Sequence, residues 1–536
     1  MASKMPALAW MTTDWTKVTD DVLVVPVFKV DSSVGAKKAS KKTTATPLQV
    51  VWTDTLTAID KAMGGELKAV IQDDNYSGEK STVLKVRAPK GSSLKCKAVV
   101  LVGFGLASAV RIDLVDKAFL KVIETLAKHK GTQSVAFLWD VLLEGVAERL
   151  LQRQLILSVA DAAMLATYAS LEAKEQSAKL EKVSLLLAKK ASSEQQADLK
   201  LGLAMANARQ MVKDMVNMPS NIKRTDTFVQ YAKQVGKLPN VSVSIQSDSK
   251  WIAKTMPCFY EVAKGSLASD PPKWIVVKYL PAAPKGVAGK AKKAPVGKHL
   301  ALVGKSLIFD TGGYQVKPGD SMVSMKGDMT GGACVLATIQ AIATVAPNIA
   351  VTAYMAVTPN LIDSNAMIPD AIVNTTCGKT VEIRHTDAEG RLTLIDAVTM
   401  AAKDKPDAMV TIATLTGAAA VAVGQRIALM SNDTALRDKV EHAARFLGEP
   451  VQPLDIGDED YESIKSKLDG ADIRNTSKTK GRGAQTAGAF VMSGAPEGLP
   501  VAHLDIAGCD IFSDETASGI GAKTLIEYVL SEANAR

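Results

Sequence analysis

The stretch that decides the fold is residues 299–345, HLALVGKSLIFDTGGYQVKPGDSMVSMKGDMTGGACVLATIQAIATV. It begins with an apolar run typical of a buried strand, passes through a polar loop, and ends in an alanine-rich helical pattern from residue 332. A second strand-like run, IAVTAYMAV, follows from Ile349. A strand, a helix and a further strand in this order indicate a largely parallel sheet with helices on both faces.

The same alternation extends over the rest of the chain. Further strand-like runs lie at residues 21–30, 97–103, 134–139, 273–280 and 408–415. A capping-box pattern at residues 192–196 opens a long helix that stops before Pro219. Because 536 residues exceed the ~250–300 beyond which single cores split, two domains are expected.

We therefore predict an α/β protein of two domains, each a mixed or mostly parallel sheet flanked by helices. The N-terminal α/β domain is expected at residues 1–190, a linking helix at 191–220, and a C-terminal domain, in which the candidate chemistry lies, at 221–536. An Ala/Pro/Gly/Lys-rich stretch at about residues 281–298 is predicted to be a flexible insertion between two strands.

The formal charge of +8 is concentrated in two short stretches. Without nine lysines the formal charge falls to about −1: Lys37, Lys38, Lys41, Lys42, Lys285, Lys290, Lys292, Lys293 and Lys298. A charge that belongs to solvated insertions does not form a nucleic-acid face, so we expect no nucleic-acid partner.

Cysteine usage and hydropathy indicate the compartment. The five cysteines, an odd number, have no CxxC spacing, which argues against a disulfide framework or a thiolate zinc site and fits a reducing compartment. The N-terminus has too short an apolar run for a secretory signal. The apolar stretch at residues 409–424 is interrupted by Thr and Gly, falls short of the ~18–20 residues of a membrane span, and is predicted to be a buried strand running into a helix. We expect a cytoplasmic protein with no membrane partner.

Charged residues gather in two regions where apolar strands should end. These residues are Lys305, Asp310, Lys317, Asp328, Asp387 and Glu389. Ligands of open α/β sheets bind beyond the carboxyl ends of the strands, where loops bring polar groups together. Four carboxylates in one pocket would repel one another unless cations neutralised them, so the cluster predicts metal, and two ions would satisfy it. Since most candidate ligands are oxygen atoms, Zn²⁺, Mn²⁺, Mg²⁺ and Co²⁺ are all candidates.

Several motifs in these regions carry a family resemblance. They are VGKS from Val303, FDTGG from Phe309, QVKPG from Gln315, MKGDM from Met325, HTDAEGRL from His385, ATLTGA from Ala413 and HLDIAG from His503. With them the half from about Asn217 onward resembles the leucyl aminopeptidase family, the M17 metallopeptidases or cytosol aminopeptidases. The resemblance implies a leucyl aminopeptidase that turns over peptides by removing N-terminal residues, preferentially leucine and other apolar ones, with water activated by two metal ions. It also implies a homohexamer.

The resemblance assigns the metal ligands. Asp310 and Glu389 would bridge two divalent ions per subunit, Lys305 and Asp328 would bind the tighter site, and Asp387 the exchangeable one. Zinc is the first choice, with manganese, magnesium or cobalt as alternatives at the exchangeable site. A lysine ligand requires a neutral amine, which two adjacent dications favour.

The resemblance also assigns the catalytic groups. Lys317 would stabilise the oxyanion of the transition state, and Arg391 would hold a bicarbonate that acts as general base. His385 replaces the usual Asn, and is expected to form a supporting hydrogen bond instead of binding metal. Ser306 replaces a usual Gly, and His503 is expected to be structural.

By resemblance, six residues would line the pocket for the substrate side chain: Met325, Thr414, Leu415, Gly417, Ala507 and Asp510. Asp510 lies where relatives often have methionine. A carboxylate facing an apolar pocket is costly to desolvate, so Asp510 should either attract a cationic substrate side chain or turn away to solvent. The sequence leaves both open.

Two other functions are compatible with parts of the sequence. A non-catalytic protein could bind nucleic acid through the basic insertions, but the intact set of charged residues argues against lost catalysis. The N-terminal domain could bind a nucleotide-like ligand at VGFG, residues 102–105, but that glycine spacing is too weak a signal. Hydrolysis of leucyl-amide, compared with salt-sensitive DNA retention, distinguishes an enzyme from a nucleic-acid-binding protein.

Overall fold

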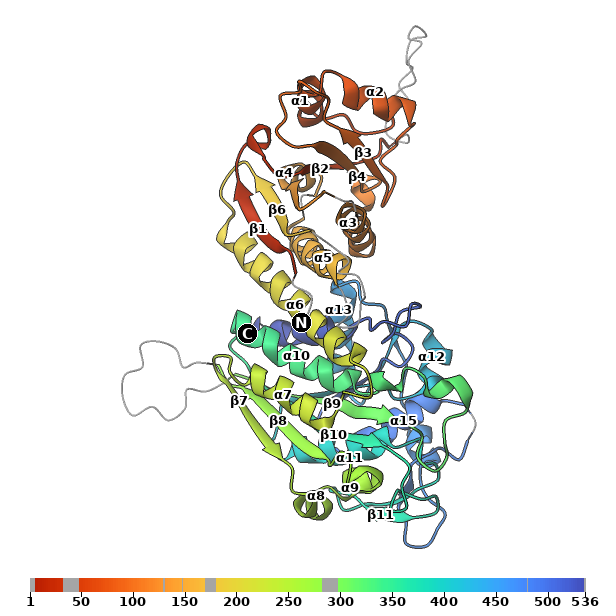
Figure 1. Cartoon of the computed structure of the whole chain (residues 1–536). Coiled ribbons are helices and arrows are strands. Elements are labelled where there is room, and N and C mark those ends of the chain that lie inside the picture. Colours follow the sequence, from red (N-terminus) through yellow and green to blue (C-terminus); the bar gives the residue numbers. More distant parts are fainter. Residues whose placement is uncertain are drawn as a thin grey trace, which may run out of the picture. The chain divides into compact units, whose positions relative to one another are not determined.

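The computed structural model describes residues 5–31, 48–128, 131–146, 148–168, 180–281, 297–479 and 481–534. The chain divides into two compact units, Met1–Ala206 and Asn207–Arg536 (Figure 1). Each unit is built on a β-sheet flanked by helices, which confirms the predicted fold class. The predicted insertion at 281–298 lies, except for its ends, outside the described residues, as do the first four lysines of the charge count.

The first unit contains a six-stranded sheet in the order β1-β6-β5-β2-β4-β3. Its strands are β1 (Ala7–Thr12), β2 (Val22–Val27), β3 (Val83–Arg87), β4 (Ala98–Gly103), β5 (Ser134–Leu138) and β6 (Lys182–Leu187). Only the pairing of β3 with β4 is antiparallel. Its helices are α1 (Asp54–Ala62), α2 (Glu66–Asp73), α3 (Ile112–Ala127), α4 (Trp139–Glu144) and α5 (Arg149–Thr167).

Alternate residues of β2 enter two different cores in this unit. Val22 and Val24 pack with residues of α3 and α5, whereas Leu23 and Val25 pack with residues of α1 and α2. Because side chains alternate across a strand, helices on both faces require apolar residues at every position of the strand. The continuous apolar run VLVVPV of β2 is explained by this arrangement.

Helix α6 (Ser193–Asn217) spans the division between the two units. The capping box predicted at its start is present, with Gln195 N donating to Ser192 Oγ (3.1 Å) and Ser192 N donating to Gln195 Oε1 (2.9 Å).

The second unit contains an eight-stranded sheet in the order β15-β14-β17-β13-β9-β10-β8-β7. Its strands are β7 (Val241–Gln246), β8 (Lys273–Tyr279), β9 (His299–Asp310), β10 (Ala350–Asn360), β13 (Ala408–Ala413), β14 (Ile427–Ser431), β15 (Val451–Pro453) and β17 (Val501–Asp505). The central strands β17, β13, β9 and β10 are parallel to one another, whereas β14 pairs with β17, β8 with β10, and β7 with β8 in antiparallel fashion. A small sheet of β11 (Ile372–Asn374), β12 (Thr380–Glu382) and β16 (Ile473–Arg474) lies apart from it.

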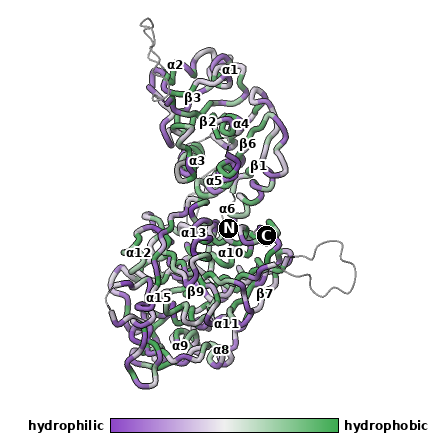
Figure 2. Tube along the Cα trace, turned by 180° about the vertical axis from the view of Figure 1, so that it is seen from behind, coloured by the Kyte–Doolittle hydropathy of each residue, from purple (hydrophilic) through white to green (hydrophobic). Residues whose placement is uncertain are grey.

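Helices flank the large sheet. They are α7 (Thr225–Val235), α8 (Ser249–Thr255), α9 (Pro257–Ala263), α10 (Thr330–Val345), α11 (Gly390–Ala402), α12 (Gly417–Val423), α13 (Thr434–Phe446), α14 (Asp458–Ser463), α15 (Gly483–Met492) and α16 (Ala522–Asn534). The residues 409–424 form most of β13 followed by α12, as predicted. The hydropathy colouring in Figure 2 lets these apolar segments be followed along the chain.

Helix α10 packs closely on the centre of the sheet. A Cβ on Gly331 would lie 2.0 Å from the carbonyl oxygen of Ile412 in β13, so only glycine allows this approach. The stretch Gly319–Val345, which includes α10, has the length and hydropathy of a membrane span, but 83% of its most apolar window is buried inside the unit. Burial of this kind is expected of a core helix.

Because the central strands are parallel, their carboxyl ends meet at one edge of the sheet, where loops collect polar residues.

The buried carboxylate of Asp396 is expected to contribute to the stability of the second unit. Its carboxylate, in α11, is fully buried and accepts hydrogen bonds from the backbone N–H groups of Phe259 (3.0 Å) and Thr376 (2.8 Å), while burial raises its pKa to about 6. Asp396→Ala leaves two buried amides without acceptors and should lower the free energy of unfolding by about 2–4 kcal/mol. Denaturant unfolding measures this, with Asp438→Ala, which removes an exposed ion pair with Arg437, as the control. Equal unfolding midpoints for the two variants would show that Asp396 has no such role.

Candidate active site

Seven charged residues named from the sequence line one cavity of about 590 Å³ in the second unit: Lys305, Asp310, Lys317, Asp328, Asp387, Glu389 and Arg391. Strand β9 provides Lys305 from its middle and Asp310 from its end. Lys317 lies on the loop that follows β9, and Asp328 comes directly after a 3-10 turn, Met325–Gly327. Asp387 lies in the turn before α11, Glu389 is the N-cap of that helix, and Arg391 lies in its first turn. Side chains up to 86 positions apart therefore meet at the carboxyl edge of the parallel strands.

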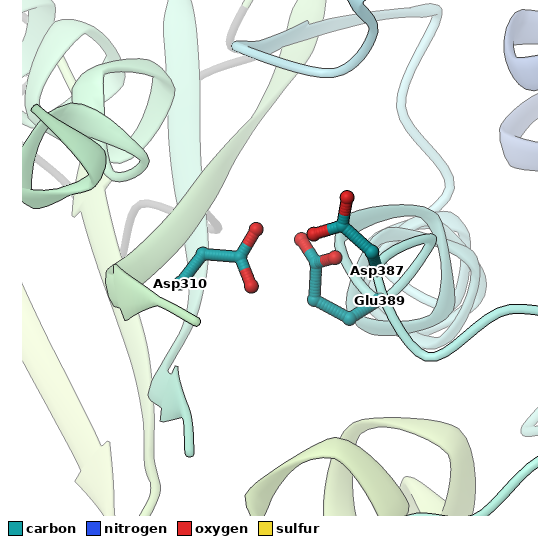
Figure 3. Close-up of side chains that lie close together, drawn as sticks. All are labelled: Asp310, Asp387 and Glu389. Carbon is teal, nitrogen blue, oxygen red and sulfur yellow. The ribbon is translucent and has the colours of Figure 1, made fainter. Parts of the chain in front are cut away.

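Three carboxylates form the centre of the cavity. One oxygen from each of Asp310, Asp387 and Glu389 lies within 4.8 Å of the others (Figure 3). Burial, with Asp310 nearby, raises the pKa of Glu389 to about 7, and the same two causes raise the pKa of Asp387. Like charges this close do not ionise together in a dry cavity unless cations accompany them.

Lys305 is enclosed by groups that attract its charge. Its Nζ lies 2.6 Å from Asp328 Oδ1 and 3.0 Å from Glu389 Oε1, and it donates to the carbonyl oxygen of Thr414 at 3.0 Å. Burial lowers the pKa of this amine, but the carboxylates outweigh burial and raise it overall. Gly390 leaves room for the side chain, because a Cβ there would lie 2.2 Å from Lys305 Cε.

Lys317 lies between two of the central carboxylates. Its Nζ is 2.8 Å from Asp310 Oδ2 and 2.5 Å from Asp387 Oδ1. Burial opposes the charge, yet Asp310 and the other carboxylates raise the pKa of Lys317 overall, so it stays an ammonium at neutral pH.

Two carboxylate oxygens in the cavity are left without partners. Asp328 Oδ2 and Glu389 Oε2 are buried and accept no hydrogen bond from any of the described residues. Burial, with Asp310 and Glu389 adding to it, raises the pKa of Asp328 although Lys305 opposes the shift. Unpaired, convergent carboxylate oxygens are the donors that divalent cations use. The residues present therefore fit a pair of divalent ions.

Arg391 lies in the first turn of α11 and differs from the two lysines. Its Nη1 donates to the backbone oxygen of Asn475 at 2.8 Å, and its buried Nε has no hydrogen-bond partner within the described part of the chain. Burial lowers the pKa of Arg391 to about 10.

Sequence reasoning missed Asn475, which holds the loop that carries Asp387 and Glu389. Its fully buried amide accepts from the N–H groups of Arg384 (2.7 Å) and His385 (3.2 Å), and donates to the carbonyl oxygens of His385 (2.7 Å) and Ala388 (3.3 Å). The Asn475 side chain therefore holds four backbone groups of this loop in place. The backbone carbonyl oxygen of Asn475 also accepts a hydrogen bond from Arg391. No local signal near residue 475 in the sequence indicates this contact.

Asn360 was missed as well. Its Nδ2 donates to Asp310 Oδ1 at 2.8 Å and to the carbonyl oxygen of Thr386 at 3.3 Å, so it connects the two acidic segments. Asn360 is the last residue of β10, next to β9 in the sheet, and a polar residue at that strand end could have been noticed.

Three residues outside the proposed ligand set form hydrogen bonds within the protein. His385 Nδ1 accepts from the backbone N–H of Asp387 at 3.2 Å. Ser306 is buried and donates to the carbonyl oxygen of Gly304. His503 is buried with Nδ1 2.7 Å from Thr411 Oγ1, and burial lowers its pKa to about 3, so it is a neutral core residue.

The six residues expected to contact the substrate side chain line the same cavity: Met325, Thr414, Leu415, Gly417, Ala507 and Asp510. Thr414 Oγ1 also donates to Asp328 Oδ1 at 2.9 Å, which connects this wall to the acidic cluster. Asp510 is only 8% exposed, so it does not turn away to solvent.

Comparisons with known proteins agree with this geometry. The model of the cytosol aminopeptidase family catalytic domain matches residues 210–526, and that of its N-terminal domain matches residues 24–197. A probable cytosol aminopeptidase of Pseudomonas paraeruginosa is 35% identical over 483 residues, covering 89% of this chain and 93% of the relative. One from Persephonella marina is 30% identical over 488 residues, covering 88% and 93%.

Solved structures share the fold. A mutant of tomato leucine aminopeptidase superposes with a TM-score of 0.81 and 25% identity, covering 99% of this chain and 97% of that one. The bottromycin maturation enzyme BotP has a TM-score of 0.76 at 23% identity, covering 96% and 99%. With matched models over both units, the chain belongs to the cytosol aminopeptidase family, the M17 metallopeptidases, and is an aminopeptidase.

Proposed function

We propose that this cavity removes N-terminal residues from peptides, leucine and other apolar residues among them, with two divalent metal ions bound per subunit. The observation that supports it most directly is the meeting of three carboxylate oxygens, from Asp310, Asp387 and Glu389, within 4.8 Å of one another.

The ligand set is the one that the family resemblance implies. Asp310 and Glu389 would serve both ions, Lys305 and Asp328 would hold the tighter site, and Asp387, the most exposed of the four carboxylates, would hold the exchangeable one. Zinc is the first choice, with manganese, magnesium or cobalt at the exchangeable site; a structure of BotP is described as a complex with Mn. Lys305 must lose its proton to serve as a ligand, which adjacent dications favour.

The chain's own residues complete the chemistry. When bound, the metal pair acidifies water and polarises the scissile carbonyl group. Lys317, charged at neutral pH, donates hydrogen bonds to the oxyanion that develops as water adds to the carbonyl carbon. Arg391 would hold a bicarbonate, as the family resemblance implies, and that group would supply the general base for the attacking water.

Two further proposals concern assembly and location. We propose a homohexamer, as the family resemblance implies. A cytoplasmic location is supported by the relatives, which are described as cytosol aminopeptidases.

The proposed function predicts a specific pattern of hydrolysis. The purified protein should hydrolyse leucyl-amide but not N-acetyl-leucyl-amide, because the free amine is needed for binding. Chelator should abolish the activity, and Zn²⁺ or Mn²⁺ should restore it. Equal hydrolysis of both amides, or full activity after chelation, would exclude a metal-dependent aminopeptidase.

Substitution of the shared ligands should cost metal as well as rate. Glu389→Gln or Asp310→Asn removes one of the two negative charges that these shared ligands carry together. Bound metal per chain should therefore fall by about one ion, and kcat should fall by ~100-fold or more. Elemental analysis after dialysis, together with leucyl-amide turnover, measures both. Glu497→Gln, at an exposed position, is the control. Unchanged metal content with full activity in the first two variants would refute the assignment.

Substitution of Lys317 should lower kcat without loss of bound metal. Lys317→Ala should keep both metal ions and lower kcat by ~100- to 1,000-fold, because the ammonium meets charge that exists only in the transition state. Steady-state kinetics with metal analysis provides the check. If KM rises while kcat stays normal, Lys317 binds substrate instead.

A further inference from the structure

Asp510 is a buried acidic residue that the proposed chemistry does not use. It lies two residues after Gly508 of the HLDIAG motif and lines the same cavity as Met325 and Leu415. Its Oδ2 lies 3.5 Å from the position that a Cβ on Gly327 would occupy, which places the carboxylate against the turn leading to Asp328. With only 8% of its surface exposed, the residue is more than nine-tenths buried.

No cation of the protein neutralises this carboxylate. Among the described residues, no side chain forms a hydrogen bond or ion pair with it, and Lys305, the charged neighbour that favours its ionisation, is already enclosed by Asp328 and Glu389. Burial raises the pKa of Asp510 to about 7, with Asp505 adding to the shift, although its own backbone N–H group, Lys305 and the backbone N–H of Ile511 oppose it. A desolvated carboxylate without a counter-ion is the group that a cationic ligand stabilises most.

The walls around Asp510 suit a long side chain with a polar end. Met325, Leu415, Ala507 and Ile511 provide apolar contacts, and Asp510 provides the charge. The methylene stems of lysine and arginine pack well on apolar surface while their charged ends seek a partner.

We propose that Asp510 makes this cavity accept peptides with an N-terminal lysine or arginine, as well as those with an apolar N-terminal residue. The inference rests on the proposed aminopeptidase function and names a further substrate class for it. Specificity arises because a cationic side chain regains in the cavity the electrostatic stabilisation that it loses on leaving water.

The test compares lysyl and norleucyl 4-nitroanilides, since norleucine has the lysine stem without its ammonium group. Full-length, metal-loaded wild type should have kcat/KM values for the two within about tenfold of each other. Asp510→Asn, which removes the charge but keeps the shape, should lower the lysyl to norleucyl ratio of kcat/KM by about tenfold. Asp514→Asn, an exposed carboxylate on the same loop, should leave the ratio unchanged.

A ratio that moves by less than about threefold in Asp510→Asn, with leucyl activity retained, would overturn the role of Asp510 and leave the aminopeptidase function standing. Failure of wild type to hydrolyse any of the three compounds would overturn both. If Asp510→Asn does not fold, competitive inhibition of wild type decides: lysine hydroxamate should bind about as tightly as norleucine hydroxamate. Binding of the lysine compound that is ~100-fold weaker would contradict the proposal.

Discussion

The structure of the second unit depends on keeping four carboxylates together in one buried cavity. Asp310, Asp328, Asp387 and Glu389 repel one another, and burial strengthens that repulsion because little water screens it. Burial, with the charge of Asp310 adding to it, raises the pKa of Glu389 to about 7. Two lysines compensate part of the charge, and the unpaired oxygens of Asp328 and Glu389 indicate that more positive charge is needed. Metal ions would supply such charge, so metal binding would also reduce the repulsion between the carboxylates.

The surrounding fold limits how this cluster can relax. Strand β9 holds Lys305 and Asp310 within the central parallel group, where neighbouring strands fix its position on both sides. The other ligand segment, before α11, has no strand to fix it and is held instead by the amide of Asn475. Asn360 then connects the two segments. The sheet and the side chains of Asn360 and Asn475 therefore hold together two acidic segments that no single helix or strand contains.

The sequence predicted the parts of this arrangement that are local. Strand alternation predicted the α/β class, and β9, β10 and α10 lie where the apolar and alanine-rich runs indicated. The charged residues were found because each belongs to a short motif at the end of such an element. Asn475 was not found because its side-chain amide binds backbone groups of residues 384–388, which lie 87 to 91 positions away, and a contact with backbone does not depend on the identity of the partner residue. The direction of Asp510 was open for a similar reason, since the choice between cavity and solvent is made by packing against Gly327.

The three basic groups of the cavity are not equivalent, and their differences bear on their roles. Lys305 and Lys317 each contact two carboxylates, so their charges already have partners in the protein. Arg391 forms no ion pair with any described residue, and its contact at Nη1 is with a neutral carbonyl oxygen. Burial lowers its pKa to about 10, yet it remains charged at neutral pH. A buried guanidinium without a carboxylate partner is a preformed site for a small planar anion, and it is the feature of this chain that best supports a bound bicarbonate as the general base.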